Sequence, residues 1–415
     1  MSDPTRRPSL EVAPLDSELP PPASAAQAEQ ERKGRLGMLC ALHFANDAYS
    51  NFLGQLMPLL VVRFHLTLAA AGGLATTSAI MASLSQPFFG TLADRLRRPW
   101  FVVLGPLITG MFFSCLILAP GRGWLVALLV VGGLGSAIFH PQGATWAARW
   151  SGRHRARDMA LFITGGSIGF SMGPVFVATA LRVLGEKHIY LMALPGVLLT
   201  LALMPAFLRE RAEIRHAASA RGVDVRAVLG PMVMLFFVVV VRSGVNQALT
   251  NFLPLLLAHR GGDPMAGAVP TTLYLLAGAL GGLAGGPLAD RFGRRNVILW
   301  SMIPTAPCIL GFLHLHGAAS WACLMLSGLI LQVSLPVNVV YAQELMPRQM
   351  STVSGLMMGF AWGVSSLLLA PIGWTADHLG LTVALTTVAA LPLVGALLAV
   401  LLPNDRGKGM AVPVA

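Results

Sequence analysis

Long apolar segments separated by short polar connections fill the chain from residue 36 to residue 402. Each has the roughly 20 apolar residues that an α-helix needs to cross a ~30 Å hydrocarbon layer. An even number of crossings would return the chain to its starting side. We therefore predict twelve membrane-spanning helices, at about 36–62, 69–92, 99–119, 124–148, 158–184, 188–208, 228–258, 267–290, 296–316, 319–343, 350–376 and 380–402.

The pattern also repeats. Residues 90–98 read GTLADRLRR and residues 286–295 read GPLADRFGRR, 196 positions apart, and each copy lies between two apolar segments. The same offset relates Asn46 to Arg242. The repeat predicts two pseudo-symmetric six-helix halves. Internal repeats with a binding site between them are typical of secondary transporters.

One connection between segments is long and polar, and it divides the chain. We predict an N-terminal half at 36–208, a cytoplasmic linker at 209–227 and a C-terminal half at 228–402. Residues 1–35 are rich in Pro, Ala and Glu and lack the basic start and apolar centre of a signal peptide, so they are predicted to form a disordered cytoplasmic tail. Residues 403–415 are predicted to form a second cytoplasmic tail.

Composition supports a membrane protein. With 55% hydrophobic and 11% charged residues and a mean hydropathy of +0.69, the chain has too little polar surface to coat a soluble globule. The formal net charge is +11, and 23 of the 29 basic residues fall on one side of the predicted spans. That bias predicts that the basic side and both termini are cytoplasmic. A nucleic-acid interface is excluded because no soluble basic face with stacking aromatics is present.

The sequence contains no pattern typical of an enzyme. Its four cysteines lie in apolar runs without paired spacing, so neither a metal site nor a disulfide is expected. The Gly-rich run at 281–286 lies inside a span and not between a strand and a helix, where a nucleotide loop would be. We expect no enzymatic activity and no cofactor.

A polar stripe in the first predicted helix is the strongest candidate site. His43, Asn46, Asp47 and Ser50 are spaced by three or four residues and share one helix face, which should line an aqueous cavity. A charge at the bilayer centre costs at least ~2.5 to 3.5 kcal/mol. Asp47 is therefore predicted to carry protons, loading and unloading them as water reaches it from alternate sides. The alternative is a permanently paired carboxylate that fixes helix packing.

Two basic side chains accompany Asp47. His140, just before Pro141 in the fourth segment, can change charge near neutral pH and is predicted to be a proton relay or a substrate contact. Its alternative is a simple hydrogen-bonded histidine. Arg242 keeps its proton and needs an anion, so we predict that it pairs with Asp47 or competes with it for a bound anion. A permanent ion pair is the alternative. The stripe around Arg242 continues with Ser243, Asn246, Gln247 and Thr250.

Further residues are expected to line the cavity or to change shape during transport. Polar positions in the spans give the cavity candidates Gln142, Gln332, Ser334, Asn338 and Tyr341. In the fifth segment, Gly169, Gly173 and Pro174 predict either tight helix packing or a hinge.

The loop pattern at 286–295 resembles the signature of the major facilitator superfamily, and the likeness extends over most of 36–402. The pairing of HFAND at 43–47 with GLGSAIFHP at 133–141 resembles, more narrowly, the fosmidomycin resistance protein group of drug efflux permeases. In such proteins an arginine usually stands at position 129, where this chain has Leu129, so His140 is the candidate for its proton-coupling task. The resemblance also implies a gate on the cytoplasmic side built from Asp94, Arg95, Asp290, Arg291 and Arg294.

These observations predict a proton-coupled antiporter of the inner membrane, a monomer that exports a drug or toxic small molecule by alternating access. Drug efflux and antibiotic resistance are implied by the resemblance. Arg242 and His140 favour a solute with an anionic group such as a phosphonate. One alternative is a proton-coupled uptake symporter for a small organic anion, which would use the same residues. A second is a membrane receptor or scaffold that does not transport.

Overall fold

Helices account for almost all of the described structure. The computed structural model describes residues 25–93, 95–151, 155–211, 225–261, 263–346 and 350–403, and these ranges contain no β-strand. The N-terminal half consists of α1 (Ala25–Ser50), α2 (Phe52–Phe64), α3 (Leu68–Ser83), α4 (Gln86–Ala93), α5 (Trp100–Phe113), η1 (Leu116–Leu118), α6 (Arg122–Trp150), α7 (Arg155–Leu184), η2 (Glu186–Ala193) and α8 (Leu194–Leu208).

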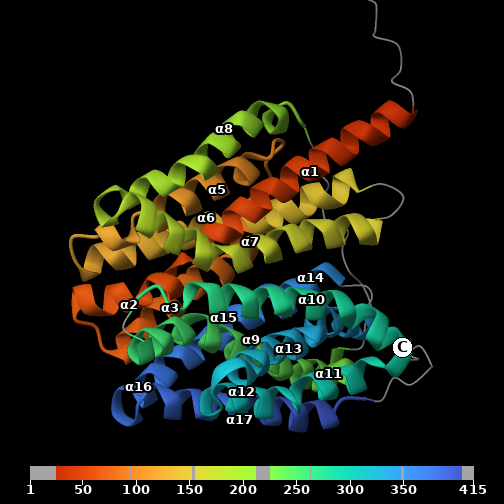
Figure 1. Ribbon diagram of the computed structural model, residues 1–415. Helices are drawn as coiled ribbons and strands as arrows, with labels where there is room; N and C mark the ends of the chain where they lie inside the picture. Colours follow the sequence, from red (N-terminus) through yellow and green to blue (C-terminus); the bar gives the residue numbers. More distant parts are fainter. Residues whose placement is uncertain are drawn as a thin grey trace, which may run out of the picture.

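The C-terminal half has the same character, with more interruptions in its helices. It consists of α9 (Val225–Gly261), α10 (Ala268–Phe292), α11 (Arg294–Met302), α12 (Thr305–His314), α13 (Gly317–Leu345), α14 (Met350–Gly355), the π-helical turn η4 (Leu356–Phe360), α15 (Ala361–Ser365), η5 (Ser366–Leu368), α16 (Leu369–Leu379) and α17 (Leu381–Val400). The helices of the two halves run side by side in one bundle (Figure 1). The chain is therefore an all-α membrane protein, as predicted.

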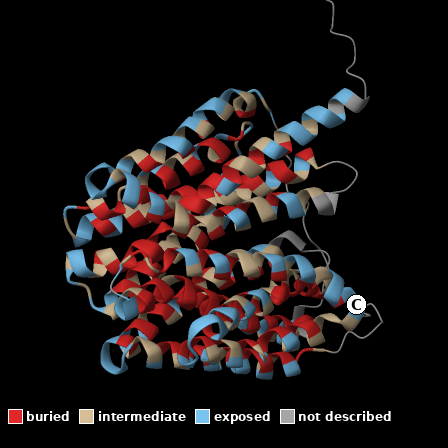
Figure 2. Ribbon diagram, in the orientation of Figure 1, coloured by how far each residue is buried: buried red, intermediate tan, exposed pale blue. Residues whose placement is uncertain are grey.

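Ten of the twelve predicted spans coincide with helical stretches that are long and apolar enough to cross a membrane. The other two lie at α5, which is shorter, and at the pair α1 and α2, which the chain breaks at Asn51. Buried residues fill the inside of the bundle and exposed ones face outward (Figure 2). Large apolar side chains such as Leu201, Leu283 and Leu397 are exposed on this outer surface, as expected where lipid takes the place of water.

Close glycine contacts hold the helices of each half together. A Cβ atom on Gly169 or Gly173 of α7 would overlap the backbone carbonyl of Phe44 or Ala48 in α1. In the second half, Gly281 of α10 lies equally close to the backbone of α13. Small residues permit such approach between membrane helices. These contacts favour the packing alternative for Gly169 and Gly173, while a hinge that also involves Pro174 stays a prediction.

Several polar contacts between the halves lie at one end of the bundle. We call this end the opposite face, where α2 ends and α3 begins; the terminal face is the end where α1 begins and α17 ends (Figure 1). At the opposite face, the Asp377 carboxylate accepts hydrogen bonds from the backbone N–H groups of Leu68 (2.7 Å) and Ala69 (2.8 Å). Arg182 and Asp263 also form an ion pair there, at 3.2 Å.

The interface continues toward the middle of the bundle through backbone contacts. Thr76 of α3 donates to the carbonyl of Ser366 (2.6 Å), in the irregular segment of the eleventh span. Gly54 of α2 lies against the backbone of Thr250 in α9. Gln55 donates to the carbonyl of Pro264 (3.3 Å). The opposite face is therefore closed by helix-to-helix contact.

We predict that Asp377 is the main polar contact of this closed face. Its carboxylate satisfies two first-turn N–H groups of α3, an interaction of about 0.5–2 kcal/mol. The substitution Asp377→Ala should shift the equilibrium toward an open face by about 5- to 30-fold at the upper end of that range. The measurement is labelling of a Thr76→Cys reporter by a membrane-impermeant maleimide added from the opposite face.

The control for this experiment is Arg182→Gln in the same reporter background. It removes an exposed ion pair, which contributes little, and should leave the labelling rate unchanged. Equal rates for Asp377→Ala and the parent reporter would show that the carboxylate does not hold the face closed.

Candidate functional site

A carboxylate between two histidines lies near the middle of the N-terminal half. Asp47 of α1 places Oδ2 3.2 Å from Nε2 of His43, one helical turn earlier, and Oδ1 3.3 Å from Nε2 of His140 in α6. Asn46 Nδ2 donates to Oδ1 at 2.9 Å. The predicted stripe in the first helix and the predicted histidine in the fourth span thus form one cluster, which we call the Asp47 cluster.

The other ring nitrogens of both histidines are held by backbone carbonyls. His43 Nδ1 lies 2.8 Å from the Phe162 carbonyl of α7, and His140 Nδ1 lies 2.8 Å from the Ser136 carbonyl. A carbonyl oxygen only accepts, so each Nδ1 must carry a hydrogen. In a neutral histidine the remaining nitrogen, Nε2, is then an acceptor. Both acceptors point at the same carboxylate.

This arrangement requires hydrogens at the carboxylate. Two lone pairs that face each other repel, so each short Nε2–oxygen contact needs a proton, either on the imidazole or on the carboxyl group. When both Nε2–carboxylate contacts are hydrogen bonds, the Asp47 cluster contains two more protons than an ionised carboxylate with two neutral histidines. Loss of these protons would leave both Nε2 lone pairs facing the carboxylate.

Neighbouring residues fix the cluster while leaving it accessible. The His43 ring stacks on Phe162 with centroids 4.1 Å apart. Gly166 of α7 leaves room for both groups, since a Cβ there would overlap the His43 ring and lie 2.7 Å from Asp47 Oδ2. The Asp47 side chain is 15% exposed and that of His140 30%. The carboxylate is therefore confined but not sealed.

Arg242 occupies the related position in the second half. It is 2% exposed and donates to Gln332 Oε1 and to Ser243 Oγ (2.9 Å). Its Nε makes no hydrogen bond, and among the described residues no carboxylate pairs with it. Asn246 extends the network, with Oδ1 accepting from Gln332 Nε2 and the Tyr274 hydroxyl, both at 3.1 Å. The guanidinium is thus buried among neutral groups.

The predicted pairing of Asp47 with Arg242 is not present in this structure. Each charge bonds inside its own half, Asp47 to histidines and Arg242 to amides and a hydroxyl. Competition between the two for an anion stays a prediction. His43 is a direct partner of Asp47, and its expected contact with substrate stays a prediction.

Three other predicted cavity residues form hydrogen bonds to segments distant in the sequence, and their contact with substrate stays a prediction. Gln142 Oε1 accepts from the backbone N–H groups of Phe101 (2.7 Å) and Val102 (3.1 Å), at the start of α5. Gln247 Nε2 donates to the Trp362 carbonyl (2.9 Å) and to Ser365 Oγ (2.6 Å). The Tyr341 hydroxyl donates to the Pro403 carbonyl at 2.7 Å.

Two further cavity candidates differ in their hydrogen bonds. Ser334 donates to the Leu331 carbonyl within its own helix, at 3.1 Å. Asn338 is buried, and neither its amide oxygen nor its amide nitrogen has a hydrogen-bond partner. Whether Asn338 contacts a solute stays a prediction.

The predicted gating residues lie at the terminal face. Arg95, Asp290 and Arg291 are exposed, and Arg294 pairs with Glu344 of α13 within its own half. Asp94 lies outside the described residues. Their role in gating stays a prediction.

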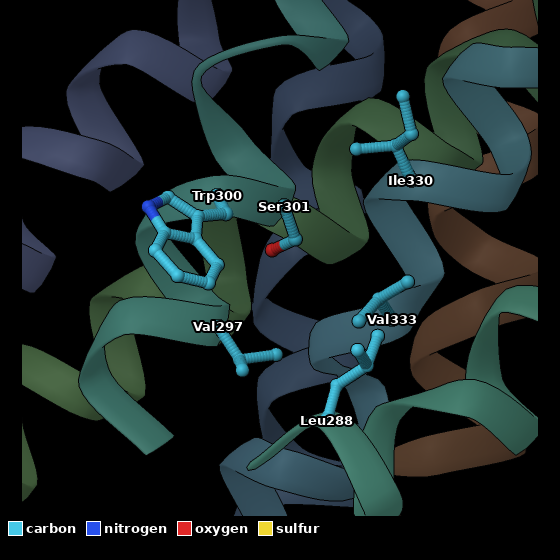
Figure 3. A pocket seen from close by; sticks show the side chains of 6 residues that line it. All are labelled: Leu288, Val297, Trp300, Ser301, Ile330 and Val333. Atoms are coloured by element: carbon cyan, nitrogen blue, oxygen red, sulfur yellow. The ribbon is translucent and has the colours of Figure 1, made fainter. Parts of the chain in front are cut away.

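An apolar groove lies apart from both polar clusters. Side chains from α10, α11 and α13 line it, and none of them is ionisable (Figure 3). The groove therefore offers no group for proton transfer or for binding an anion. Its lining residues are Leu288, Val297, Trp300, Ser301, Ile330 and Val333.

Comparison with known families and proteins fits this architecture. The profile of the Major Facilitator Superfamily matches residues 39–370 and 235–413. The chain is 30% identical over 374 residues to the uncharacterized MFS-type transporter YfnC of Bacillus subtilis (strain 168), covering 88% of this chain and 91% of that one. It is 28% identical over 408 residues to the fosmidomycin resistance protein of Escherichia coli (strain K12), covering 94% and 99%.

A solved structure has the same fold. A mutant form of the nucleoside transporter NupG superimposes with a TM-score of 0.74 at 16% sequence identity. The match covers 89% of this chain and 99% of that one. At this identity the likeness concerns the fold alone.

We predict that Arg242 lowers the stability of the empty protein. A charge in the middle of a span costs at least ~2.5 to 3.5 kcal/mol, and neutral hydrogen bonds offset only part of that. Arg242→Gln removes the charge and keeps a hydrogen-bonding side chain, so it should raise the melting temperature of purified protein without solute. The matched control is Arg260→Gln, near the opposite face. A lower melting temperature for Arg242→Gln alone would mean that the guanidinium is a structural partner.

Proposed function

Because the chain belongs to the major facilitator superfamily of membrane transporters, we propose that it exports a toxic small molecule with an anionic group in exchange for protons. The buried guanidinium of Arg242, without a counter-ion among the described residues, is the observation that carries this proposal. An anionic solute would supply the missing charge. The likeness to a fosmidomycin resistance protein supports export and makes fosmidomycin, a phosphonate, the first solute to test.

The anion site would be built around Arg242. The unpartnered Nε offers a donor, and the neighbouring Gln332 and Asn246 can exchange their mutual hydrogen bond for one to the solute. A guanidinium suits phosphonate and carboxylate because its donors match two oxygens at once. Asn338 supplies a further unused amide.

Protons would bind at the Asp47 cluster, on the other half. Its two Nε2–carboxylate contacts have room for two protons, and losing them leaves a bare carboxylate and two neutral imidazoles. Because the cluster and Arg242 lie in different halves, a rocking motion that changes the distance between them would change their electrostatic coupling. Anion binding near Arg242 and protonation near Asp47 would then favour different conformations.

Access in this conformation would come from the terminal face. The opposite face is closed, and α2 beyond Asp47 is buried along most of its length, whereas Phe44, one turn toward the terminal face, is 39% exposed. The distribution of basic residues supports a cytoplasmic terminal face, in the inner membrane, with both termini inside. The protein would work as a monomer.

The available energy is adequate for export. One charge crossing a membrane potential of 100 mV contributes about 2.3 kcal/mol before any pH gradient is counted. A single proton per cycle could thus drive the conformational change, and the two positions of the Asp47 cluster would accommodate a second.

Inside-out vesicles with an acidic interior test the proposal. Adding fosmidomycin should discharge the pH gradient, because each solute that enters drives protons out. Asp47→Asn should abolish the discharge, since the amide cannot titrate, while Asp263→Asn, an exposed acid at the opposite face, should leave it intact. Transport is read with a pH-sensitive dye.

Two outcomes would contradict antiport. Further acidification on adding solute indicates a proton symporter working toward uptake. No change with any of a panel of anionic solutes, together with no counterflow in proteoliposomes, indicates a protein that does not transport.

A further inference from the structure

We propose that the Asp47 cluster is also a binding site for a divalent transition-metal ion of the zinc type. It brings two imidazoles and a carboxylate together, and within the described ranges no other group of three such ligands converges in this way. The inference goes beyond proton-coupled export and does not depend on it. Sequence spacing offered no reason to expect it, because the third ligand comes from a different helix.

The distances suit a tetrahedral ion. Zn²⁺ binds imidazole nitrogen and carboxylate oxygen at about 2.0–2.2 Å, so neighbouring ligands around it lie roughly 3.3–3.5 Å apart. Asp47 Oδ2 is 3.2 Å from His43 Nε2, and Oδ1 is 3.3 Å from His140 Nε2. All the ligand atoms lie within 4.8 Å of one another. The two contacts of the carboxylate are thus close to the spacing that a tetrahedral ion sets between its ligands.

The surrounding hydrogen bonds are those that a metal site needs. A ligating histidine commonly donates its other N–H to a carbonyl or carboxylate, which fixes the ring and its tautomer. Both histidines do this, His43 to Phe162 and His140 to Ser136. Each Nε2 lone pair is thereby directed at the shared space. Asn46 holds the carboxylate by donating to Oδ1.

The site has room for a fourth ligand and a suitable charge. The His140 side chain is 30% exposed, which leaves a position for water or a solute oxygen. One carboxylate and two neutral imidazoles carry a single negative charge, so a divalent ion is half neutralised by its ligands.

Protons and metal would compete, because both use the same two Nε2 lone pairs and the same carboxylate. Metal binding should therefore release protons and weaken as the pH falls. The competing description is that the Asp47 cluster binds two protons and has no affinity for metal. The experiment below distinguishes these two descriptions.

The test is titration of the purified full-length protein with Zn²⁺ alone, by calorimetry in chelator-free buffers that differ in ionisation enthalpy. We expect one site per chain, with proton release at neutral pH. His43→Gln, His140→Gln and Asp47→Asn should each weaken binding by at least the roughly 10- to 100-fold that loss of a second-shell partner costs. Co²⁺ bound at the same site should give the visible absorption of a tetrahedral complex.

His378→Gln is the matched control. His378 lies exposed on α16 and makes the same contact as His140, from Nδ1 to the carbonyl four residues earlier (2.9 Å). It belongs to no such group of three among the described residues, so its loss should not change the affinity. Melting curves of each variant without metal establish that it is folded.

Two results would overturn the site. One is the absence of Zn²⁺ binding to the wild type. The other is binding that the three cluster variants do not weaken, which indicates an adventitious ion only. Either result leaves proton-coupled export standing, because the vesicle assay contains no metal. Conversely, failure of the vesicle assay would contradict proton-coupled export and would leave the Zn²⁺ site standing, because Zn²⁺ binding does not require transport.

Discussion

The contact of one carboxylate with two imidazole nitrogens in the middle of the bundle is the interaction on which the proposed chemistry depends. Asp47 lies inside a span with Nε2 of His43 and Nε2 of His140 beside its carboxylate, at 3.2 and 3.3 Å. A charged group in hydrocarbon is expensive, so a paired and titratable group is the form in which an acid is tolerated there. The backbone carbonyls of Phe162 and Ser136 set the protonation pattern by occupying the other nitrogens. Helix packing and proton chemistry are thereby linked.

The two halves use the repeated position in different ways. In the first half, Asn46 accepts from Thr109 and donates to Asp47, so that it supports the acid. Its counterpart in the second half is Arg242, supported by Gln332 and Ser243. One half therefore holds an acid beside two histidines, and the other holds a buried cation.

Much of the fold follows from the sequence because a lipid environment imposes simple rules. Apolar length predicts the spans, and the repeat predicts the two halves. The predicted spans differ most from the structure at the first span, where the helix is broken at Asn51, and at α5, which is shorter than predicted. At both places tertiary packing decides where the helices end. The choice between packing and flexing for Gly169 could not be made from composition, since it depends on how near Phe44 lies.

The site was predictable only along single helices. The four-residue spacing of His43 and Asp47 placed both side chains on one helix face. Partners on other helices have no such signature: a backbone carbonyl such as that of Phe162 can be contributed by any residue. The prediction that Asp47 pairs with Arg242 was wrong for this structure. Opposite charges in two helices do not establish how far apart the two side chains lie. Gln142, at the start of α5, shows how a buried amide can serve the backbone instead.

Nitrogen-15 NMR of histidine-labelled protein in lipid tests the central claim most directly, since it reports which ring nitrogens of His43 and His140 carry hydrogen. We predict that Nδ1 carries hydrogen in both residues, because each Nδ1 lies 2.8 Å from a backbone carbonyl oxygen. Neutral rings with hydrogen on Nε2 and a bare Nδ1 would contradict this assignment, because the carbonyl bonds that organise the cluster could not then exist.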